Sequence, residues 1–151
     1  MLPDVLIAEI EYGSDAYEAA FSLRDAVLRR PLGLALDAAD RARDRGDRHF
    51  AAFDGDTVVA CLVATPLGGG VFRLRQTAVA GPFRGRGLGT RLMREVETVL
   101  RGAGAVELTL HARVERVAFY ERLGFKTRGP TFVEVTVPHR LMRKSLRATD
   151  A

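Results

Sequence analysis

The chain has 151 residues, of which 47% are hydrophobic and 28% charged, and it carries a formal net charge of +4 at pH 7. This balance predicts one globular domain over residues 1–151 and excludes long disorder, and no apolar run reaches the roughly 18 residues of a membrane-spanning helix. The N-terminus also lacks a basic segment followed by an apolar one, so we expect a cytoplasmic protein without a membrane partner.

The positive charge comes almost entirely from arginine, because Lys126 and Lys144 are the only lysines. A basic chain raises nucleic-acid binding as a candidate function. The arginines, however, are scattered among 19 acidic residues, and no aromatic-rich platform for single strands is found. This distribution argues against a nucleic-acid-binding protein and favours a charged, solvated surface.

The N-terminal part predicts a strand over residues 5–12 and then two helices. Asp15 and Glu18 have the spacing of a capping box, which places a helix start there, and Pro31 ends that helix. Residues 33–45 predict a second helix with a weak apolar stripe, so we expect it to be largely exposed.

A β-hairpin follows, with strands over residues 49–53 and 57–65 joined by Asp54-Gly55, a strong hairpin signal. The proline and three glycines of residues 66–70 predict the next turn, which leads into a strand over residues 71–79.

A glycine-rich loop separates this strand from an amphipathic helix. Residues 79–90 read Val-Ala-Gly-Pro-Phe-Arg-Gly-Arg-Gly-Leu-Gly-Thr, and apolar residues then recur every three or four positions from Leu88 to Leu100. A helix N-terminus exposes unpaired N–H groups, and glycines let an anion approach them closely. The loop therefore predicts a site for a phosphate-bearing ligand.

Two familiar phosphate loops do not fit this spacing. A nucleoside triphosphatase loop needs a lysine after its last glycine, whereas this chain has Gly87-Leu88-Gly89-Thr90. A dinucleotide fingerprint needs a third glycine where Thr90 stands. Neither a triphosphatase nor a dinucleotide-binding domain is supported.

Residues 106–111 alternate strictly and predict a strand, followed by a helix over residues 114–123. The order strand, helix, strand from residue 71 to residue 111 implies a right-handed crossover and a parallel strand pair. Ligand crevices open at the carboxyl ends of such strands.

The C-terminal part predicts a short strand over residues 125–128 and a turn at Gly129-Pro130. Residues 132–137 alternate like a strand. Pro138 has no N–H for a central ladder, so we expect a bulge or loop there and a final strand over residues 139–146.

Three segments resemble one family, the GNAT N-acetyltransferases. The loop Arg84-x-x-Gly87-x-Gly89 is similar to that family's acyl-CoA pyrophosphate loop, and Phe119 to Phe125 resembles its F-Y-x-x-x-G-F segment. Residues 137–144 resemble the closing segment of the ElaA-like branch. The resemblance covers nearly the whole chain and implies an α/β GNAT acyl-CoA N-acyltransferase fold, a mixed, mostly antiparallel sheet with a central parallel pair and helices on both faces.

The resemblance also implies acetyl-CoA as cosubstrate and a small-molecule or peptide amine as acceptor. A backbone N–H at Ala78 or Val79 would face the oxyanion that forms when the amine attacks the thioester. The residues that would bind the cosubstrate are Ala78, Val79, Arg84, Gly85, Arg86, Gly87, Leu88, Gly89 and Thr90.

Tyr120 matches the position of the family's general acid, which protonates the departing CoA thiolate; the alternative is a core tyrosine beside Val117 and Leu123. His111, Glu134 and His139 are candidates for a base or for the acceptor site, and the alternative for each is a structural or exposed polar role.

The three scattered histidines and the single cysteine give no ligand spacing for a metal site. Cys61 lies in an apolar run and is expected to be a buried, reduced thiol. His49 has no partner that the sequence identifies.

Two further functions remain open: a CoA-binding or partner-binding domain of the same fold without transfer activity, and a small basic nucleic-acid-binding protein. The acceptor is also open, because residues 30–48 and 129–139, which we expect around it, fit a polyamine, an amino acid, an antibiotic or a peptide. The sequence allows a homodimer without indicating one.

Overall fold

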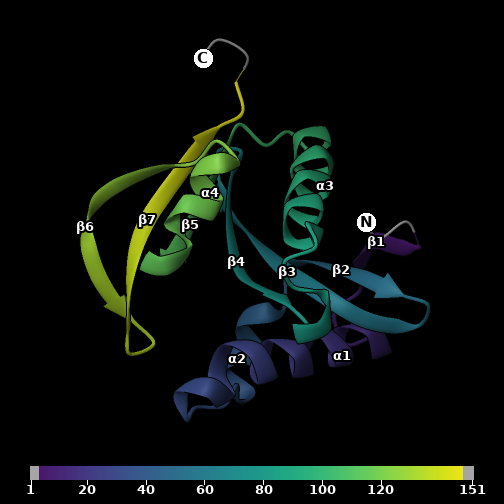
Figure 1. The fold of residues 1–151 in the computed structure, drawn as a ribbon. Helices are drawn as coiled ribbons and strands as arrows, with labels where there is room; N and C mark the ends of the chain where they lie inside the picture. Colours follow the sequence, from purple (N-terminus) through teal and green to yellow (C-terminus); the bar gives the residue numbers. More distant parts are fainter. Residues whose placement is uncertain (1–3, 148–151) are drawn as a thin grey trace.

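A computed structural model describes residues 4–147 and contains a seven-stranded sheet in the order β1-β2-β3-β4-β5-β7-β6 (Figure 1). All neighbouring strands are antiparallel except β4 and β5, which are parallel. The strands are β1 (Val5–Ile10), β2 (Arg48–Asp54), β3 (Thr57–Gly68), β4 (Val71–Val79), β5 (Glu107–Arg113), β6 (Lys126–Glu134) and β7 (Val137–Ser145). The predicted mixed sheet with one central parallel pair is confirmed.

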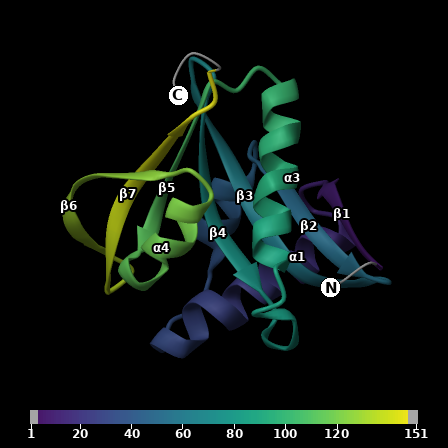
Figure 2. The same ribbon diagram turned by 45° about the horizontal axis from the view of Figure 1, so that its top comes forward.

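Helices cover both faces of the sheet. One face carries α1 and η1, and the other carries α3 and α4, so that Figure 2 shows α3 in front of the strands and α1 behind them. The helical elements are α1 (Asp15–Arg24), the π-helical turn η1 (Asp25–Arg29), η2 (Arg30–Leu32), α2 (Ala38–Asp44), η3 (Gly81–Phe83), α3 (Leu88–Gly102), η4 (Val114–Arg116) and α4 (Val117–Arg122).

The apolar stripe of α3 forms the centre of the core. Leu88, Leu92, Val96 and Leu100 are fully buried and pack in one cluster with residues of β3, β4 and β5. Burial of each leucine contributes about 1.5–3 kcal/mol relative to an exposed one. Val99 is one of the apolar residues of the predicted repeat from Leu88 to Leu100, but the structure leaves its side chain exposed. The packing fixes the start of α3 beside the end of β4.

β4 and β5 pair only over their first halves, from Val71–Glu107 to Leu74–Leu110. Beyond Leu74, β4 contains a bulge, because it has one residue more than β3 between the pairs Cys61–Ala78 and Val63–Arg75. Gln76 adopts a φ of 52°, which only a few per cent of non-glycine residues adopt. The two parallel strands therefore separate, and within residues 4–147 the edge of β4 beyond Leu74 has no partner strand.

The N-terminal helices differ from the sequence prediction at their ends. Ser14, and not Asp15, is the N-cap of α1, since its hydroxyl accepts a hydrogen bond from Tyr17 N. Pro31 does not end the helical path, which continues through η2 and stops at Gly33 with a φ of 73°. α2 is shorter than predicted because its capping box begins at Asp37.

Two prolines, Pro66 and Pro130, and two glycines, Gly68 and Gly129, lie inside strands where turns were predicted. Pro66 belongs to β3 beyond its last pair with β2, so it has a partner strand on one side only. Gly129 and the following proline lie in a break of register within β6. The closing turn is at Val135 and Thr136, both with positive φ.

Pro138 lies within β7, and the bulge or loop expected at this residue is absent. It stands opposite Val133 of β6, whereas the pairing of β7 with β5 begins only at His139. Because a proline lacks an N–H, it fits this end of the strand, where one neighbour is missing.

Candidate active site

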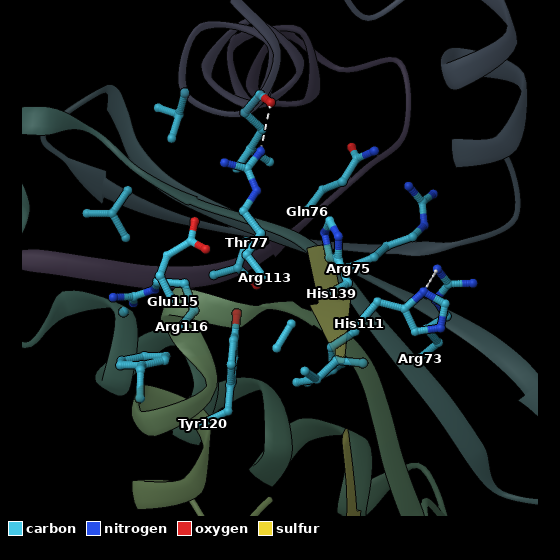
Figure 3. Close-up of a pocket in the computed structure, with 18 of the residues that line it drawn as sticks. Arg73, Arg75, Gln76, Thr77, His111, Arg113, Glu115, Arg116, Tyr120 and His139 are labelled. Carbon is cyan, nitrogen blue, oxygen red and sulfur yellow. Dashed lines mark hydrogen bonds between the residues drawn. The ribbon is translucent and has the colours of Figure 1, made fainter. Parts of the chain in front are cut away.

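A cavity of about 1100 Å³ opens where β4 and β5 separate. Its walls come from the glycine loop before α3, the ends of β4 and β5, η1, α4 and the turn between β6 and β7. Figure 3 shows that the labelled side chains of β4, β5 and α4 converge on this space from different elements. The cavity thus lies at the carboxyl ends of the parallel strands, as the sequence predicted.

The glycine loop presents backbone at the start of α3. Gly85 and Gly87 have φ values of 71° and 80°, which favour glycine, and no atom would lie within 4 Å of a Cβ at either position. Gly87 is the N-cap of α3, and no side chain in the described part of the chain caps the helix. The first N–H groups of α3 are therefore free of side-chain partners and suit an anion.

Most of the predicted cosubstrate residues line the cavity. These are Val79, Arg84, Gly85, Gly87, Leu88, Gly89 and Thr90. Ala78 is buried against α1, and Arg86 lies over the ring of Phe83, so neither lines it. The side chain of Leu88 belongs to the core, which leaves its backbone for a ligand.

The unpartnered edge of β4 carries the backbone of Val79. Ala80 N donates to Val59 O at 2.8 Å, which directs the N–H of Ala80 toward β3. Successive N–H groups of an extended strand point to opposite edges, so the N–H of Val79 faces the opening. Arg84 Nε donates to Val79 O at 3.0 Å and closes the glycine loop against the strand.

Tyr120 projects from α4 into the cavity, and its hydroxyl points toward Thr77 and Arg113 in Figure 3. The rings of Phe119 and Phe125 lie edge-on to its ring. Burial raises the pKa of Tyr120, and a hydrogen bond with the Thr77 side chain offsets part of the rise. The phenol is therefore protonated at neutral pH and can donate a proton.

His111, Glu134 and His139, predicted as base or acceptor residues, lie together. His111 Nδ1 is 2.8 Å from Glu134 Oε1, and His139 Nε2 is 3.9 Å from Glu134 Oε2. His139 Nδ1 is 2.8 Å from Val137 O, and its ring stacks on Phe132. The three residues come from β5, β6 and β7.

Arg73 joins this cluster from β4. Its Nη2 lies 2.8 Å from His111 Nδ1, an interaction drawn in Figure 3, and 3.6 Å from Glu134 Oε1. An Nδ1 that carries a proton donates to Glu134, and an Nδ1 without one accepts from Arg73. Both protonation states of this nitrogen thus have a partner.

A buried ion network supports the cavity from the α1 side, and the sequence did not reveal it. Asp44, at the end of the helix expected to be exposed, is completely buried and accepts from Arg24 Nη2 and Tyr17 Oη, both at 2.5 Å. Arg75 Nη2 donates to Asp44 Oδ1 at 2.8 Å. Arg24 Nη1 also donates to Gln76 Oε1 at 2.5 Å, which ties the bulge of β4 to α1.

His49 belongs to the same network and is structural. Its Nε2 lies 2.9 Å from Asp44 O, and its ring stands edge-on to Tyr17. Burial lowers the pKa of His49, so the neutral imidazole, with Nε2–H donating to the carbonyl, is favoured.

Several arginines that line the cavity were not singled out in the sequence. Arg29, Arg73, Arg75 and Arg113 come from three elements. The sequence could have indicated two of them. Arg73 and Arg75 flank Leu74 in a predicted strand, so their side chains share one face of the sheet. Arg29 and Arg113 meet only through the fold.

Within residues 4–147, no group of three or more His, Cys, Asp or Glu side chains is placed to hold a metal ion. Over the same residues, every helix is too short or too polar to cross a membrane. Cys61 is buried, and burial raises the pKa of its thiol to about 12.

Comparison with known proteins agrees with this architecture. The sequence profile of the acetyltransferase (GNAT) family matches residues 14–125, so the chain belongs to that family. The uncharacterized protein YyaT of Bacillus subtilis is 28% identical over 74 residues, which are 49% of this chain and 50% of that protein. The chain therefore matches about half the length of this relative.

Solved structures share the fold over almost their full length. Escherichia coli ElaA has a TM-score of 0.80 at 19% identity, covering 93% of this chain and 99% of that one. An aminoglycoside 6'-N-acetyltransferase complexed with coenzyme A also has a TM-score of 0.80 at 19% identity, covering 97% and 99%. At these identities the likeness establishes the fold.

Proposed function

We propose that this protein transfers the acetyl group of acetyl-CoA to a primary amine by direct attack on the thioester. The observation that carries the proposal is the convergence, on one cavity, of an uncapped glycine loop, an unpartnered strand edge and a protonated tyrosine. Membership of the acetyltransferase family supports the same reaction class.

The glycine loop is the site that we assign to the pyrophosphate of the cosubstrate. The N–H groups of residues 84–90 would bind its oxygens at the positive end of α3, and Arg84 adds a positive charge. The pantetheine chain has amide groups, which suit the backbone groups along the separated edge of β4. A structural neighbour was solved with coenzyme A, which supports this class of ligand.

The reaction forms a C–N bond and breaks the C–S bond. The amine nitrogen attacks the thioester carbonyl, and the N–H of Val79 stabilises the oxyanion that develops. Collapse of this intermediate releases the CoA thiolate, which takes a proton from the hydroxyl of Tyr120. Before the attack, the ammonium form of the acceptor gives a proton to His111, directly or through water, and Glu134 holds the imidazolium that forms. The second proton, which the new amide nitrogen loses, returns to the Tyr120 phenolate through solvent.

The two substrates approach from opposite faces of the sheet. Tyr120 and the glycine loop lie on the α3 and α4 face, whereas His111 and Arg73 lie on the α1 face. The opening between β4 and β5 joins the two sides. The acetyl group would thus reach the acceptor through the sheet.

The test is calorimetric titration with acetyl-CoA, followed by CoA release over a panel of primary amines. Micromolar binding together with amine-dependent release is the expected result. Binding without release for every amine would favour a CoA-binding or partner-binding domain. Salt-dependent binding of duplex DNA, without acetyl-CoA binding, would favour a nucleic-acid-binding protein.

A further inference from the structure

Two guanidinium groups meet at one carbonyl oxygen on the acceptor side of the cavity. Arg29 Nη1 and Arg113 Nη2 both donate to Leu28 O, at 3.3 and 2.9 Å. Arg29 belongs to η1 and Arg113 ends β5, so the pair connects the α1 side to the separated strand. In Figure 3 the side chain of Arg113 extends across the opening to the helical segment above it.

Neither guanidinium forms an ion pair with a carboxylate of residues 4–147 within the 4.0 Å salt-bridge distance. Burial lowers the pKa of Arg29, and Arg113 lowers it further, while Asp40 and Glu134 act in the opposite direction from longer range. Two like charges are thus held together, partly desolvated, without an anion between them. Such an arrangement is costly unless an anion joins it.

Arg73 adds a third unsatisfied group on the same side. Its Nε is buried and has no hydrogen-bond partner among the residues that the structure describes, although its Nη2 contacts His111. By contrast, Arg75 on the same strand is neutralised by Asp44 and Asp47, at 2.8 and 2.6 Å. Arg73 itself lies 3.6 Å from Glu134 Oε1, so the positive charge that lacks a carboxylate partner is localised at Arg29 and Arg113.

The cavity as a whole also carries a net positive charge, because its walls contain eight arginines and three carboxylates. Arg84 and its loop neighbours face the expected phosphates of the cosubstrate, on the other side of the sheet. A polyamine or an aminoglycoside, which carries several ammonium groups, would be repelled at the acceptor side. An acceptor with its own anion would supply the missing counter-ion.

Resting on the proposed acetyl transfer, we infer that the acceptor is a primary amine that carries a carboxylate or a phosphate, bound by Arg29 and Arg113. Both guanidinium groups can present paired N–H donors to an oxyanion. The amine of the acceptor then lies toward His111 and the opening, where the acetyl group arrives.

The experiment compares acceptors with and without the anion, and kcat/KM is calculated on the concentration of neutral amine because a nearby anion also raises the pKa of the amine. Glycine is paired with glycinamide, and phosphoethanolamine with ethanolamine, with spermidine as the polycationic competitor. We expect kcat/KM for at least one anionic member to exceed that of its neutral partner at least about tenfold, the scale of a charge-assisted hydrogen bond. The two pairs separate carboxylate from phosphate recognition.

Substitutions test whether Arg29 and Arg113 cause the preference for anionic acceptors. Arg29→Gln and Arg113→Gln should each reduce it several-fold and leave the KM of acetyl-CoA unchanged. Arg128→Gln, which removes the same charge from an exposed position of β6 outside the cavity, is the matched control. Equal use of both partners, a preference for spermidine, or a rise in the KM of acetyl-CoA in Arg29→Gln would overturn the inference.

A binding measurement makes the inference independent of turnover. With CoA present, N-acetylglycine or N-acetylphosphoethanolamine should bind more tightly than the corresponding neutral amide or alcohol, and the gain should be lost in Arg113→Gln. If no amine is acetylated but this anion-dependent binding is found, the proposed acetyl transfer is rejected and the proposed anion site is supported. If transfer occurs without any anion preference, only the anion site fails.

Discussion

His111 Nδ1 lies 2.8 Å from Glu134 Oε1, a contact that joins β5 to β6 on the acceptor side of the cavity. The same nitrogen lies 2.8 Å from Arg73 Nη2, so gain or loss of its proton exchanges one partner for the other. The imidazole of His111 therefore has a hydrogen-bond partner in either protonation state of Nδ1. It can accept and release a proton without a change in the position of its side chain.

We predict that His111→Gln lowers kcat about 10²- to 10⁴-fold near neutral pH, the range for a lost general base. The affinity for acetyl-CoA should not change. The deficit should shrink as the pH rises toward the pKa of the amine, because a growing fraction of the acceptor is already neutral. A deficit of the same size at every pH would show that the histidine is structural.

For Tyr120→Phe we expect turnover to fall about 10²- to 10⁴-fold, since the variant keeps the ring and loses the proton donor. Affinity for acetyl-CoA and melting temperature should stay close to the parent values, because Phe119 and Phe125 still pack on the ring. Because the pKa of Tyr120 is raised, the parent enzyme should show no loss of this acid below about pH 10. Turnover equal to that of the parent, with the chemical step shown to be rate-limiting, would mean that water and not Tyr120 protonates the CoA thiolate.

Gly87→Val tests the phosphate loop. A β-branched residue at a φ of 80° is strained and would turn the loop N–H groups away from the ligand, so calorimetry should detect no acetyl-CoA binding. Gly102→Val, at the other end of α3 where a Cβ meets no atom within 4 Å, is the control and should bind normally. Normal binding by both folded variants would place the cosubstrate elsewhere.

Arg84→Ala should weaken acetyl-CoA binding about 5- to 10-fold, or roughly 1 to 1.4 kcal/mol, because the side chain is exposed and its charge is screened. It should also release Val79 O, to which Arg84 Nε donates. Measuring the dissociation constant at two salt concentrations checks the charge: the difference between parent and variant should narrow at high salt. Equal constants at low salt would leave Arg84 as surface charge.

The buried histidine predicts a pH dependence of stability. The folded pKa of His49 lies below its unfolded value of about 6.5, so the folded state resists protonation. Stability is therefore fully present above about pH 6.5 and falls as the pH drops from there through the folded pKa. In urea titrations, the free energy of unfolding of His49→Gln should fall less between pH 7 and 5 than that of the parent. An equal fall in both proteins would show that His49 is not the group responsible.

The fold could be predicted where short segments decide it. The apolar repeat from Leu88 to Leu100, the glycine loop and the crossover from β4 to β5 are readable from adjacent residues. The positions of Pro66 and Pro138 inside strands could not be predicted. Each proline is tolerated only because a neighbouring strand has ended at that point, and the sequence does not show where strands end relative to one another.

The candidate site likewise contains residues that local motifs indicate and residues that only the fold brings together. Gly87, Gly89 and Tyr120 stand in local motifs, and the structure places all three at the cavity, although their roles remain proposals. Asp44 was expected to be exposed because α2 is polar, and its burial is explained by partners distant in sequence, which are Tyr17, Arg24 and Arg75. Arg113 reaches Leu28 across 85 residues, which no local pattern records.

The lone cysteine gives the protein its own probe of folding. Cys61 lies under α1, where its thiol donates to Ala20 O at 3.6 Å. Its high pKa and its burial keep it from reacting with disulfide dyes while the chain is folded, so a dye assay of the native enzyme counts only the thiol of released CoA. The same dye added in denaturant labels each unfolded molecule once, and turnover and opening of the α1 side can thus be followed with one reagent.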